Sequence, residues 1–130
     1  MAKKIEIQVG EEKAVAELLE DQAPNTCKAI WELLPCKGNL VHSKIAGPEI
    51  YFKIPVFVEK ENLTIKQKAG DVTLFDDGQC MCIYYDDLPG IGYANSFARI
   101  TENLTGIRKE GLKGWKSQGA LIILRRKQDD

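Results

Sequence analysis

The residues best suited to chemistry in this chain are one histidine and two closely spaced cysteines. His42 is the only histidine, and Cys80 and Cys82 stand two positions apart, so on a strand they share one face. Such side chains could hold zinc, or a cysteine could act as a nucleophile with His42 as its base. A closed zinc site usually takes four ligands, and a reactive cysteine needs a stabilised thiolate. We therefore expect no metal and no cofactor, and we expect His42 to be a hydrogen-bonded residue of the fold.

A second group with chemical potential consists of aromatic side chains with polar tips. Tyr51 and Tyr84 combine apolar rings with hydroxyl groups, and Phe75 adds an apolar ring, the mixture that small-molecule and peptide sites use. Packing within a core explains the same residue types, so their position in the fold decides between the two interpretations.

The stretch 70–87 must position most of these side chains. Two apolar runs, 72–75 and 80–85, flank Asp76-Asp77-Gly78, and this arrangement predicts a β-hairpin. In its second strand, one face carries Cys80, Cys82 and Tyr84, and the other carries Met81, Ile83 and Tyr85. Both faces are mostly apolar, which predicts a strand of a closed or covered sheet with one face on the core and the other at the floor of a pocket.

The rest of the chain predicts a mostly β domain. We expect strands over 4–9, 13–19, 39–45, 49–52, 97–101 and 120–124, and a surface loop over 88–92. A helix is predicted from Pro24 to Leu34, and a short late helix begins near Thr101 or Asn103 and ends at the glycines 111 and 114. The segment 54–58 contains a proline and predicts an edge or irregular strand. This order favours a β-barrel with peripheral helices.

Length and charge exclude several classes of partner. The 130 residues suit one domain, and 18 lysines and arginines balance 19 aspartates and glutamates, so no net field favours nucleic acid or an anionic membrane. No apolar run approaches the ~20 residues of a membrane span. We expect a single cytoplasmic domain over 1–130, with neither nucleic acid nor membrane as a partner, whose four cysteines are buried thiols.

The order of these elements resembles the cyclophilin fold, and several motifs do so locally. The segment 18–27 resembles the cyclophilin entry into the first helix, 41–45 falls where cyclophilins carry a His-Arg pair, and 97–104 is similar to the signature before their late helix. A closer similarity is to small prokaryotic cyclophilin-like domains without an established activity. The motifs shared with that group are Gly-x-Glu-Ile-Tyr-Phe at 47–52, Gly-Asp-Val at 70–72 and a Cys-x-apolar strand at 82–85.

This resemblance implies the cyclophilin barrel without its usual chemistry. In prolyl isomerases of this fold, the arginine after the histidine stabilises the twisted prolyl amide, and here that position holds Ser43. A serine hydroxyl is short and uncharged, and Lys44 is expected on the opposite face of the strand. The glutamine and paired phenylalanines of the proline pocket are also missing, with Tyr51, Cys80 and Cys82 near those places.

Three hypotheses follow from the sequence. The first is a domain that binds a small molecule or short peptide in a groove bordered by His42, Ser43, Tyr51, Phe75, Cys82 and Tyr84. The second keeps weak prolyl isomerase activity through hydrogen bonds from Ser43 or Tyr51. The third is a self-associating module, a homo-oligomer that pairs through the apolar segment 54–58 at its edge.

Overall fold

The computed structural model describes residues 3–44, 47–75, 80–87 and 93–127. The predicted turn at 76–78 and the predicted loop at 88–92 lie outside the described residues. The secondary-structure elements are β1 (Lys4–Val9), β2 (Glu12–Leu18), α1 (Pro24–Leu33), β3 (Cys36–Asn39), β4 (Val41–His42), β5 (Glu49–Lys53), β6 (Leu63–Thr64), β7 (Asp71–Phe75), β8 (Cys80–Tyr84), β9 (Ala94–Glu102), α2 (Leu104–Lys116) and β10 (Leu121–Arg126).

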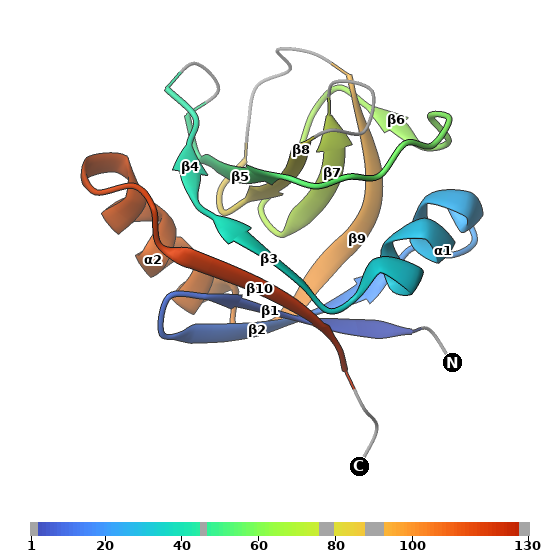
Figure 1. Cartoon of the computed structure of the whole chain (residues 1–130). Helices are drawn as coiled ribbons and strands as arrows, with labels where there is room; N and C mark the ends of the chain where they lie inside the picture. Colours follow the sequence, from blue (N-terminus) through green and yellow to red (C-terminus); the bar gives the residue numbers. More distant parts are fainter. Residues whose placement is uncertain (1–2, 45–46, 76–79, 88–92, 128–130) are drawn as a thin grey trace.

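The strands form one antiparallel sheet that curves into a nearly closed barrel (Figure 1). Neighbouring strands follow the order β3-β10-β1-β2-β9-β7-β8-β5-β4, and β6 pairs with β9 beside this path. The two helices lie at opposite ends of the barrel in Figure 1. This arrangement confirms the mostly β barrel with one early and one late helix.

The sheet closes because its first and last strands are nearly continuous in the chain. β3 pairs with β10, β4 pairs with β5, and only Leu40 separates β3 from β4. The Leu40 amide donates to the Ala120 carbonyl at 2.8 Å, and the Leu40 carbonyl accepts from the Gly119 amide at 2.9 Å. The side chain of Leu40 is 1% exposed. One bent stretch of chain therefore joins the two edges of the sheet.

The strand β8 has the two-faced burial that its sequence predicts. Met81, Ile83 and Tyr85 belong to the main hydrophobic core inside the barrel. Cys82 and Tyr84 are 1% and 2% exposed, yet they belong to a separate cluster on the outer face of the sheet. The alternation of side chains along one strand thus produces two distinct buried environments.

The helix α1 begins at Pro24, as predicted, and a carboxylate from a distant segment caps its first turn. Glu61 accepts hydrogen bonds from the amides of Asn25 and Thr26, at 3.2 and 2.7 Å, and from the Thr26 hydroxyl at 2.8 Å. Burial alone would raise the pKa of Glu61, but these hydrogen bonds outweigh burial and lower it. A negative charge at a helix N-terminus also complements the helix dipole.

The helix α2 is longer than predicted, because neither Gly111 nor Gly114 ends it. Asn103 caps its start by accepting a hydrogen bond from the Gly106 amide at 3.1 Å, which confirms one of the two predicted caps. The glycines mark close approach to the barrel instead. A Cβ atom at Gly111 would lie 2.6 Å from the Tyr85 ring, and one at Gly114 would lie 2.7 Å from Leu40.

The segment 54–58 is irregular and is not part of the sheet. Ile54 and Val56 are 3% and 5% exposed and pack on the core, whereas Phe57 is 71% exposed. Pro55 has no amide hydrogen to donate to a neighbouring strand, which disfavours sheet pairing here. The edge strand on which the self-association hypothesis relied is therefore not formed.

The close approach of α2 predicts that Gly111→Ala destabilises the protein. Alanine favours helix over glycine by about 1 kcal/mol. The added methyl group would, however, press on the buried ring of Tyr85, and overpacking of this kind costs about 1 to 3 kcal/mol. We expect a net loss in the free energy of unfolding, measured by urea denaturation, whereas Lys109→Ala on the exposed side of α2 should change it by less than about 0.5 kcal/mol. An unchanged or higher stability of Gly111→Ala would contradict this explanation of the glycine.

Candidate functional site

A row of polar side chains crosses the outer face of the sheet over four neighbouring strands. Tyr51 of β5 lies opposite Cys82 of β8, Cys82 lies opposite Thr73 of β7, and Thr73 lies opposite Ser96 of β9. Directly opposed residues of antiparallel strands point to the same side of the sheet. The four side chains therefore form one continuous strip, which faces away from the barrel core.

The members of this strip, and the residues beside it, are largely withdrawn from solvent. Cys82 and Tyr84 form a buried cluster against which Tyr51 and Cys80 pack. Thr73 and Ser96 are 0% and 4% exposed. Tyr51, Cys82 and Tyr84, three of the six site residues predicted from the sequence, are thus brought together.

A carboxyl group adjoins the strip on the same face of β5, two residues before Tyr51. Glu49 lies opposite Tyr84 in the β5 and β8 pairing and is 9% exposed. The Cys82 thiol on the adjacent strand β8 interacts with the Glu49 carboxyl group. Burial raises the pKa of Glu49, and the interaction with Cys82 lowers it by less, so the net change is upward.

Burial also favours the neutral forms of the other titratable groups of the cluster. Burial, followed by the nearby Glu49 charge, raises the pKa of the Cys82 thiol well above its ordinary value. Burial likewise raises the pKa of the Tyr84 and Tyr51 hydroxyls. The Thr73 hydroxyl lies 3.4 Å from the Tyr84 hydroxyl. These groups can donate and accept hydrogen bonds, but a thiolate nucleophile at Cys82 is disfavoured at neutral pH.

His42 lies on the other side of the sheet from this cluster. It is opposite Ile50, a core residue, so its ring points into the barrel while Tyr51 points out. The ring is 1% exposed and packs edge-on against Trp115 of α2, with 4.9 Å between ring centroids. His42 is therefore buried beneath α2 and does not border the outer face.

Both ring nitrogens of His42 have hydrogen-bond partners. Nδ1 lies 2.8 Å from the Ser43 carbonyl oxygen, and Nε2 lies 2.7 Å from the Tyr85 hydroxyl. A carbonyl oxygen can only accept, so the proton of the neutral ring is on Nδ1 and Nε2 accepts from Tyr85. This confirms the expectation that His42 is a hydrogen-bonded residue of the fold.

The two remaining predicted residues lie at the margins of the cluster. Ser43 follows β4, and its amide donates to the Glu49 carbonyl at 2.9 Å, which places it beside the carboxyl-bearing end of β5. Phe75 ends β7 opposite Cys80 and is 36% exposed. Ser43, Phe75 and the cluster therefore share one region of the barrel, and His42 alone is separated from it.

Sequence reasoning missed three polar members of this region. Glu49 and Thr73 fall within predicted strands, Ser96 lies just before one, and none of the three is among the predicted site residues. The signal was alternation, because Val72 and Leu74 of β7 both face the core and Thr73 between them must face out. Assigning Glu49 to the outer face required the register between β5 and β8, which a single sequence does not contain.

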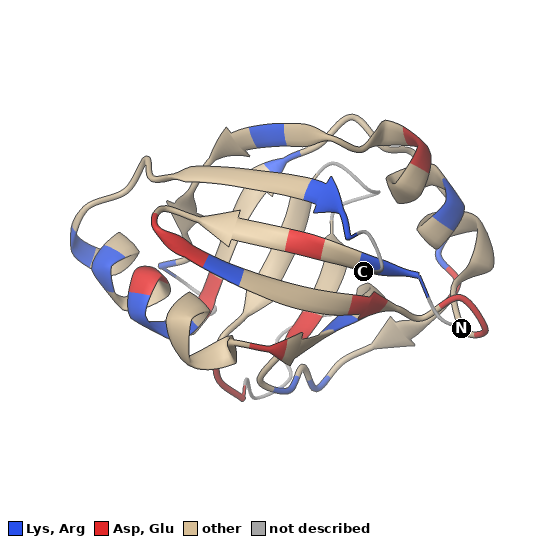
Figure 2. Ribbon diagram, turned by 90° about the horizontal axis from the view of Figure 1, so that it is seen from below, with Lys and Arg blue, Asp and Glu red and all other residues tan. Residues whose placement is uncertain are grey.

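Several charged residues outside the cluster form ion pairs on the surface of the barrel. Arg99 of β9 pairs with Asp71 of β7 at 2.7 Å, and Arg125 of β10 pairs with Glu6 of β1 at 2.9 Å. Figure 2 shows charges of both signs along β1, β2 and β10, which lie side by side in that view. The basic residues near the C-terminal end of the chain therefore belong to a mixed, solvated surface.

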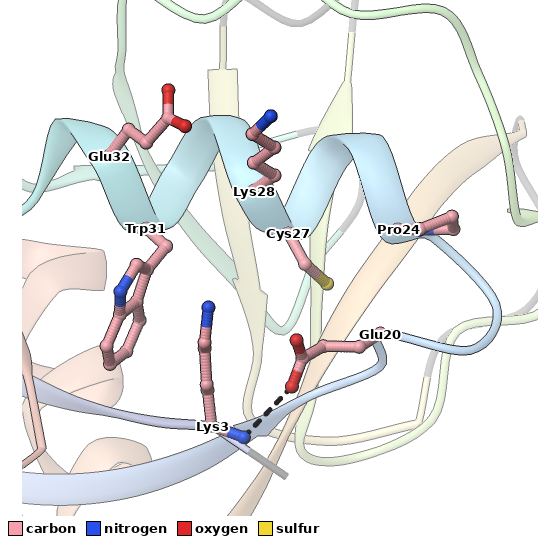
Figure 3. Close-up of a pocket in the computed structure, with 7 residues that line it drawn as sticks. All are labelled: Lys3, Glu20, Pro24, Cys27, Lys28, Trp31 and Glu32. Atoms are coloured by element: carbon pink, nitrogen blue, oxygen red, sulfur yellow. Dashed lines mark hydrogen bonds between the residues drawn. The ribbon is translucent and has the colours of Figure 1, made fainter.

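A cavity of about 350 Å3 lies elsewhere, between α1 and the beginning of β1 (Figure 3). The ring of Trp31 forms one wall, and the Lys3 ammonium lies 5.1 Å from its centroid. The Cys27 thiol also faces the cavity, but it donates to the Phe97 carbonyl at 3.3 Å, and burial raises its pKa to about 12. None of the six site residues predicted from the sequence lines this cavity.

Neither a metal-binding group of side chains nor a membrane-spanning helix is found among the described residues. Among the described residues, no three His, Cys, Asp or Glu side chains lie close enough together to hold a metal ion. No helix within the described ranges is long and apolar enough to cross a membrane. All four cysteines are described, and no disulfide joins any of them.

Comparison with known proteins identifies one family. The family model described as protein of unknown function, DUF3830, matches residues 5–123. No curated protein matches the chain.

Solved structures share the fold of this chain. McbB in complex with tryptophan superposes with a TM-score of 0.86 and 23% identity over 97% of this chain and 45% of McbB, so the chain spans less than half of McbB. The hypothetical protein AF2241 from Archaeoglobus fulgidus gives 0.70 and 29%, over 97% of this chain and 95% of that one. A cyclophilin-type peptidyl-prolyl cis-trans isomerase of Cryptosporidium parvum gives 0.77 and 17%, with both chains fully covered. These similarities confirm the cyclophilin-like fold.

Burial of the single histidine makes the stability of the protein depend on pH. Burial lowers the pKa of His42 below its ordinary value of 6.5, so the unfolded chain binds this proton more readily than the folded protein does. The free energy of unfolding should therefore fall as the pH falls below 6.5, by up to about 1.4 kcal/mol per pH unit. Glu49, with its raised pKa, contributes a slope of the opposite sign.

Urea denaturation of the protein and of His42→Gln between pH 7.5 and 5.5 separates the two contributions. The variant should be less stable throughout this range and should lack the part of the slope that belongs to His42. Equal slopes in the two proteins would contradict the assignment.

Proposed function

The chain belongs to the DUF3830 family, whose function is unknown, and we propose that it binds a small molecule on the outer face of β5 and β8. Tyr51, Cys82 and Tyr84 form the centre of this site, and Ser43, Glu49 and Phe75 lie at its margins. The proposal includes the cytoplasmic location predicted from the sequence, where thiols such as Cys82 stay reduced.

One observation carries the proposal: the outer face of β8 holds a cluster of aromatic, thiol and hydroxyl groups that is separate from the barrel core. An outer sheet face without a role would favour solvated, charged side chains, since antiparallel sheets commonly expose one polar face. Here the outward positions of β8 hold Cys80, Cys82 and Tyr84, and none of these side chains carries the charge that a solvated face favours. Apolar and aromatic walls with a few convergent polar groups are typical of small-molecule sites.

The similarity to McbB supports the same class of function. Its structure contains tryptophan, a small aromatic amino acid, and the fold superposes over nearly the whole of this chain. We extend to this chain only the class of ligand, a small molecule with an aromatic part, because Tyr51 and Tyr84 offer rings that pack against such a group.

A titration of the isotope-labelled protein with a library of small aromatic compounds tests the proposal. Bound compounds should shift the backbone amide resonances of β5 and β8 more than those of β1 and β10, which lie across the barrel. Shifts concentrated around Trp31 would move the binding site to the cavity beside α1. Shifts produced only by extended peptides would assign the face to a peptide instead, and the absence of shifts with any compound would refute the proposal.

Tyr51→Ala should weaken binding of a compound found in this way by at least tenfold. The Tyr51 ring packs on the cluster at the partly exposed side of the face, so its removal takes away contact area without opening the barrel core. Calorimetric titration measures the change in affinity. Leu121→Ala, which truncates an exposed apolar side chain on β10, serves as the control and should leave the affinity unchanged. Equal losses in the two variants would show that the compound does not contact Tyr51.

Prolyl isomerase activity is the alternative that the fold itself favours, because a cyclophilin-type isomerase shares it. Ser43 stands where the cyclophilin isomerases carry their catalytic arginine, and it has no charge with which to polarise a prolyl amide. Arg99 reaches the same face of the sheet but is paired with Asp71.

We therefore expect no acceleration of proline isomerisation. The exchange rate of a proline-containing peptide, which takes tens of seconds without a catalyst, should be the same with and without the protein. An acceleration that Ser43→Ala abolishes would establish the isomerase hypothesis in place of simple binding.

A further inference from the structure

The carboxyl group of Glu49 is buried without a cation beside it. The ion pairs recorded between described side chains join Arg99 to Asp71, Arg108 to Asp86, Lys113 to Glu110 and Arg125 to Glu6, and none includes Glu49. The partner that the described residues provide for Glu49 is the neutral Cys82 thiol. A buried carboxylate without a counter-charge is costly, so the site favours whatever neutralises it.

The groups that face Glu49 are all neutral hydrogen-bonding groups. Cys82 and Tyr84 lie on the adjacent strand β8, and Tyr51 lies on the same face of β5. The Arg99 guanidinium shares the outer face, but β8 and β7 stand between β5 and β9, a separation of roughly 14 Å at three strand spacings. Arg99 is also occupied by Asp71 at 2.7 Å. Lys53 also has its side chain on the outer face of β5, but it lies four residues from Glu49, roughly 13 Å along the strand, and no ion pair joins the two. No described side chain therefore supplies the positive charge that an ionised Glu49 requires.

We propose that the outer-face site selects a small organic amine, whose ammonium group pairs with Glu49 and whose aromatic or apolar part lies against Tyr51. This inference rests on the proposed function and specifies the class of ligand. The ammonium group supplies the counter-charge that the fold omits, and a charge-assisted hydrogen bond in a buried setting is stronger than one between neutral groups. An anionic ligand of the same shape is rejected, because two like charges would share a site of low polarity.

Access to Glu49 runs over the partly exposed side of the cluster. Tyr51 and Cys80 are partly exposed and Phe75 is 36% exposed, whereas Cys82 and Tyr84 are covered. The ligand thus lies over the exposed side of Tyr51 and the start of β8, and it reaches the carboxyl group of Glu49 at the beginning of β5.

Binding of an amine by this route releases a proton whenever Glu49 starts in its neutral form. The carboxyl group loses its proton to solvent, and the ammonium group then pairs with the carboxylate that remains. Affinity therefore rises with pH up to the pKa of Glu49 in the free protein, levels off above it, and falls once the ammonium group itself loses a proton. The Cys82, Tyr51 and Tyr84 groups stay neutral throughout this range, because burial raises the pKa of each.

Three probes of similar shape and different charge test the inference. Tryptamine carries an ammonium group, 3-methylindole is neutral, and indole-3-acetate carries a carboxylate. At pH 7.5 calorimetric or resonance titration should show tryptamine binding at least tenfold more tightly than 3-methylindole, and indole-3-acetate binding more weakly than either. Equal affinities for tryptamine and 3-methylindole, or a preference for indole-3-acetate, would overturn the inference and leave the proposed binding function standing.

A pair of carboxyl variants locates the preference. Glu49→Gln keeps the shape of the side chain and should reduce the preference for tryptamine over 3-methylindole to less than threefold. Asp71→Asn removes a carboxylate from the same sheet face, where Arg99 already balances it, and should leave the preference intact. A preference that survives Glu49→Gln, or that is lost in Asp71→Asn alone, would refute the assignment to Glu49.

A measurement on the unaltered protein keeps the inference testable if Glu49→Gln fails to fold. The heat of tryptamine binding, measured at one pH in buffers of different ionisation enthalpy, reports the number of protons released. Because the pKa of Glu49 is raised above its ordinary value, we expect proton release and an affinity that increases with pH on the acid side of that pKa, in titrations from pH 5 to pH 8. Binding of tryptamine without proton release and without pH dependence would overturn the inference. Failure of all three probes to bind would refute both the inference and the proposed function.

Discussion

Side chains of β8 point alternately into and out of the barrel, yet those at its centre are buried on both sides. Inward, Met81 and Ile83 join the hydrophobic core, and outward, Cys82 and Tyr84 join a second cluster. A strand can be covered on both faces only if the sheet closes or another layer covers it. The link through Leu40 joins the two edges of the sheet and closes the inner side, and the outer cluster forms because its residues lie opposite one another on neighbouring strands.

The sequence predicted this part of the fold because it is encoded in local alternation. The assignment of Cys82 and Tyr84 to one face and Tyr85 to the other needed only the two-residue period of a strand. Tertiary contacts decide the features that were missed. In the sequence, Gly111 and Gly114 indicated the end of a helix. In the structure, their lack of a Cβ atom lets α2 lie against Tyr85 and Leu40. Nothing local to α1 indicates that Glu61, 35 residues beyond Thr26, caps it.

His42 shows how a correct local pattern can still leave the side of a strand undetermined. Its position resembles the histidine of a cyclophilin groove, but β4 has only two residues and follows the bend at Leu40. The pairing of His42 with Ile50 fixes the ring on the inner side, where Tyr85 and Trp115 enclose it. Ser43, the next residue, then lies beside Glu49 at the margin of the outer cluster. Ser43, which stands at the position of the cyclophilin arginine, thus lies near the outer cluster, whereas the His42 ring lies in the core.

The electrostatics of the outer cluster separate binding from covalent chemistry. A cysteine beside a carboxyl group suggests a nucleophile and its base, yet that pairing works only if the thiolate is stabilised relative to the thiol. Burial and the Glu49 charge act together against the Cys82 thiolate, and no described cation opposes them. The same burial raises the pKa of Glu49, so burial shifts both groups toward their protonated forms, and a cation from outside would oppose that shift at the carboxyl group. The proposed preference for an ammonium group follows from this balance, because a bound cation would stabilise the ionised form of the carboxyl group, which burial disfavours.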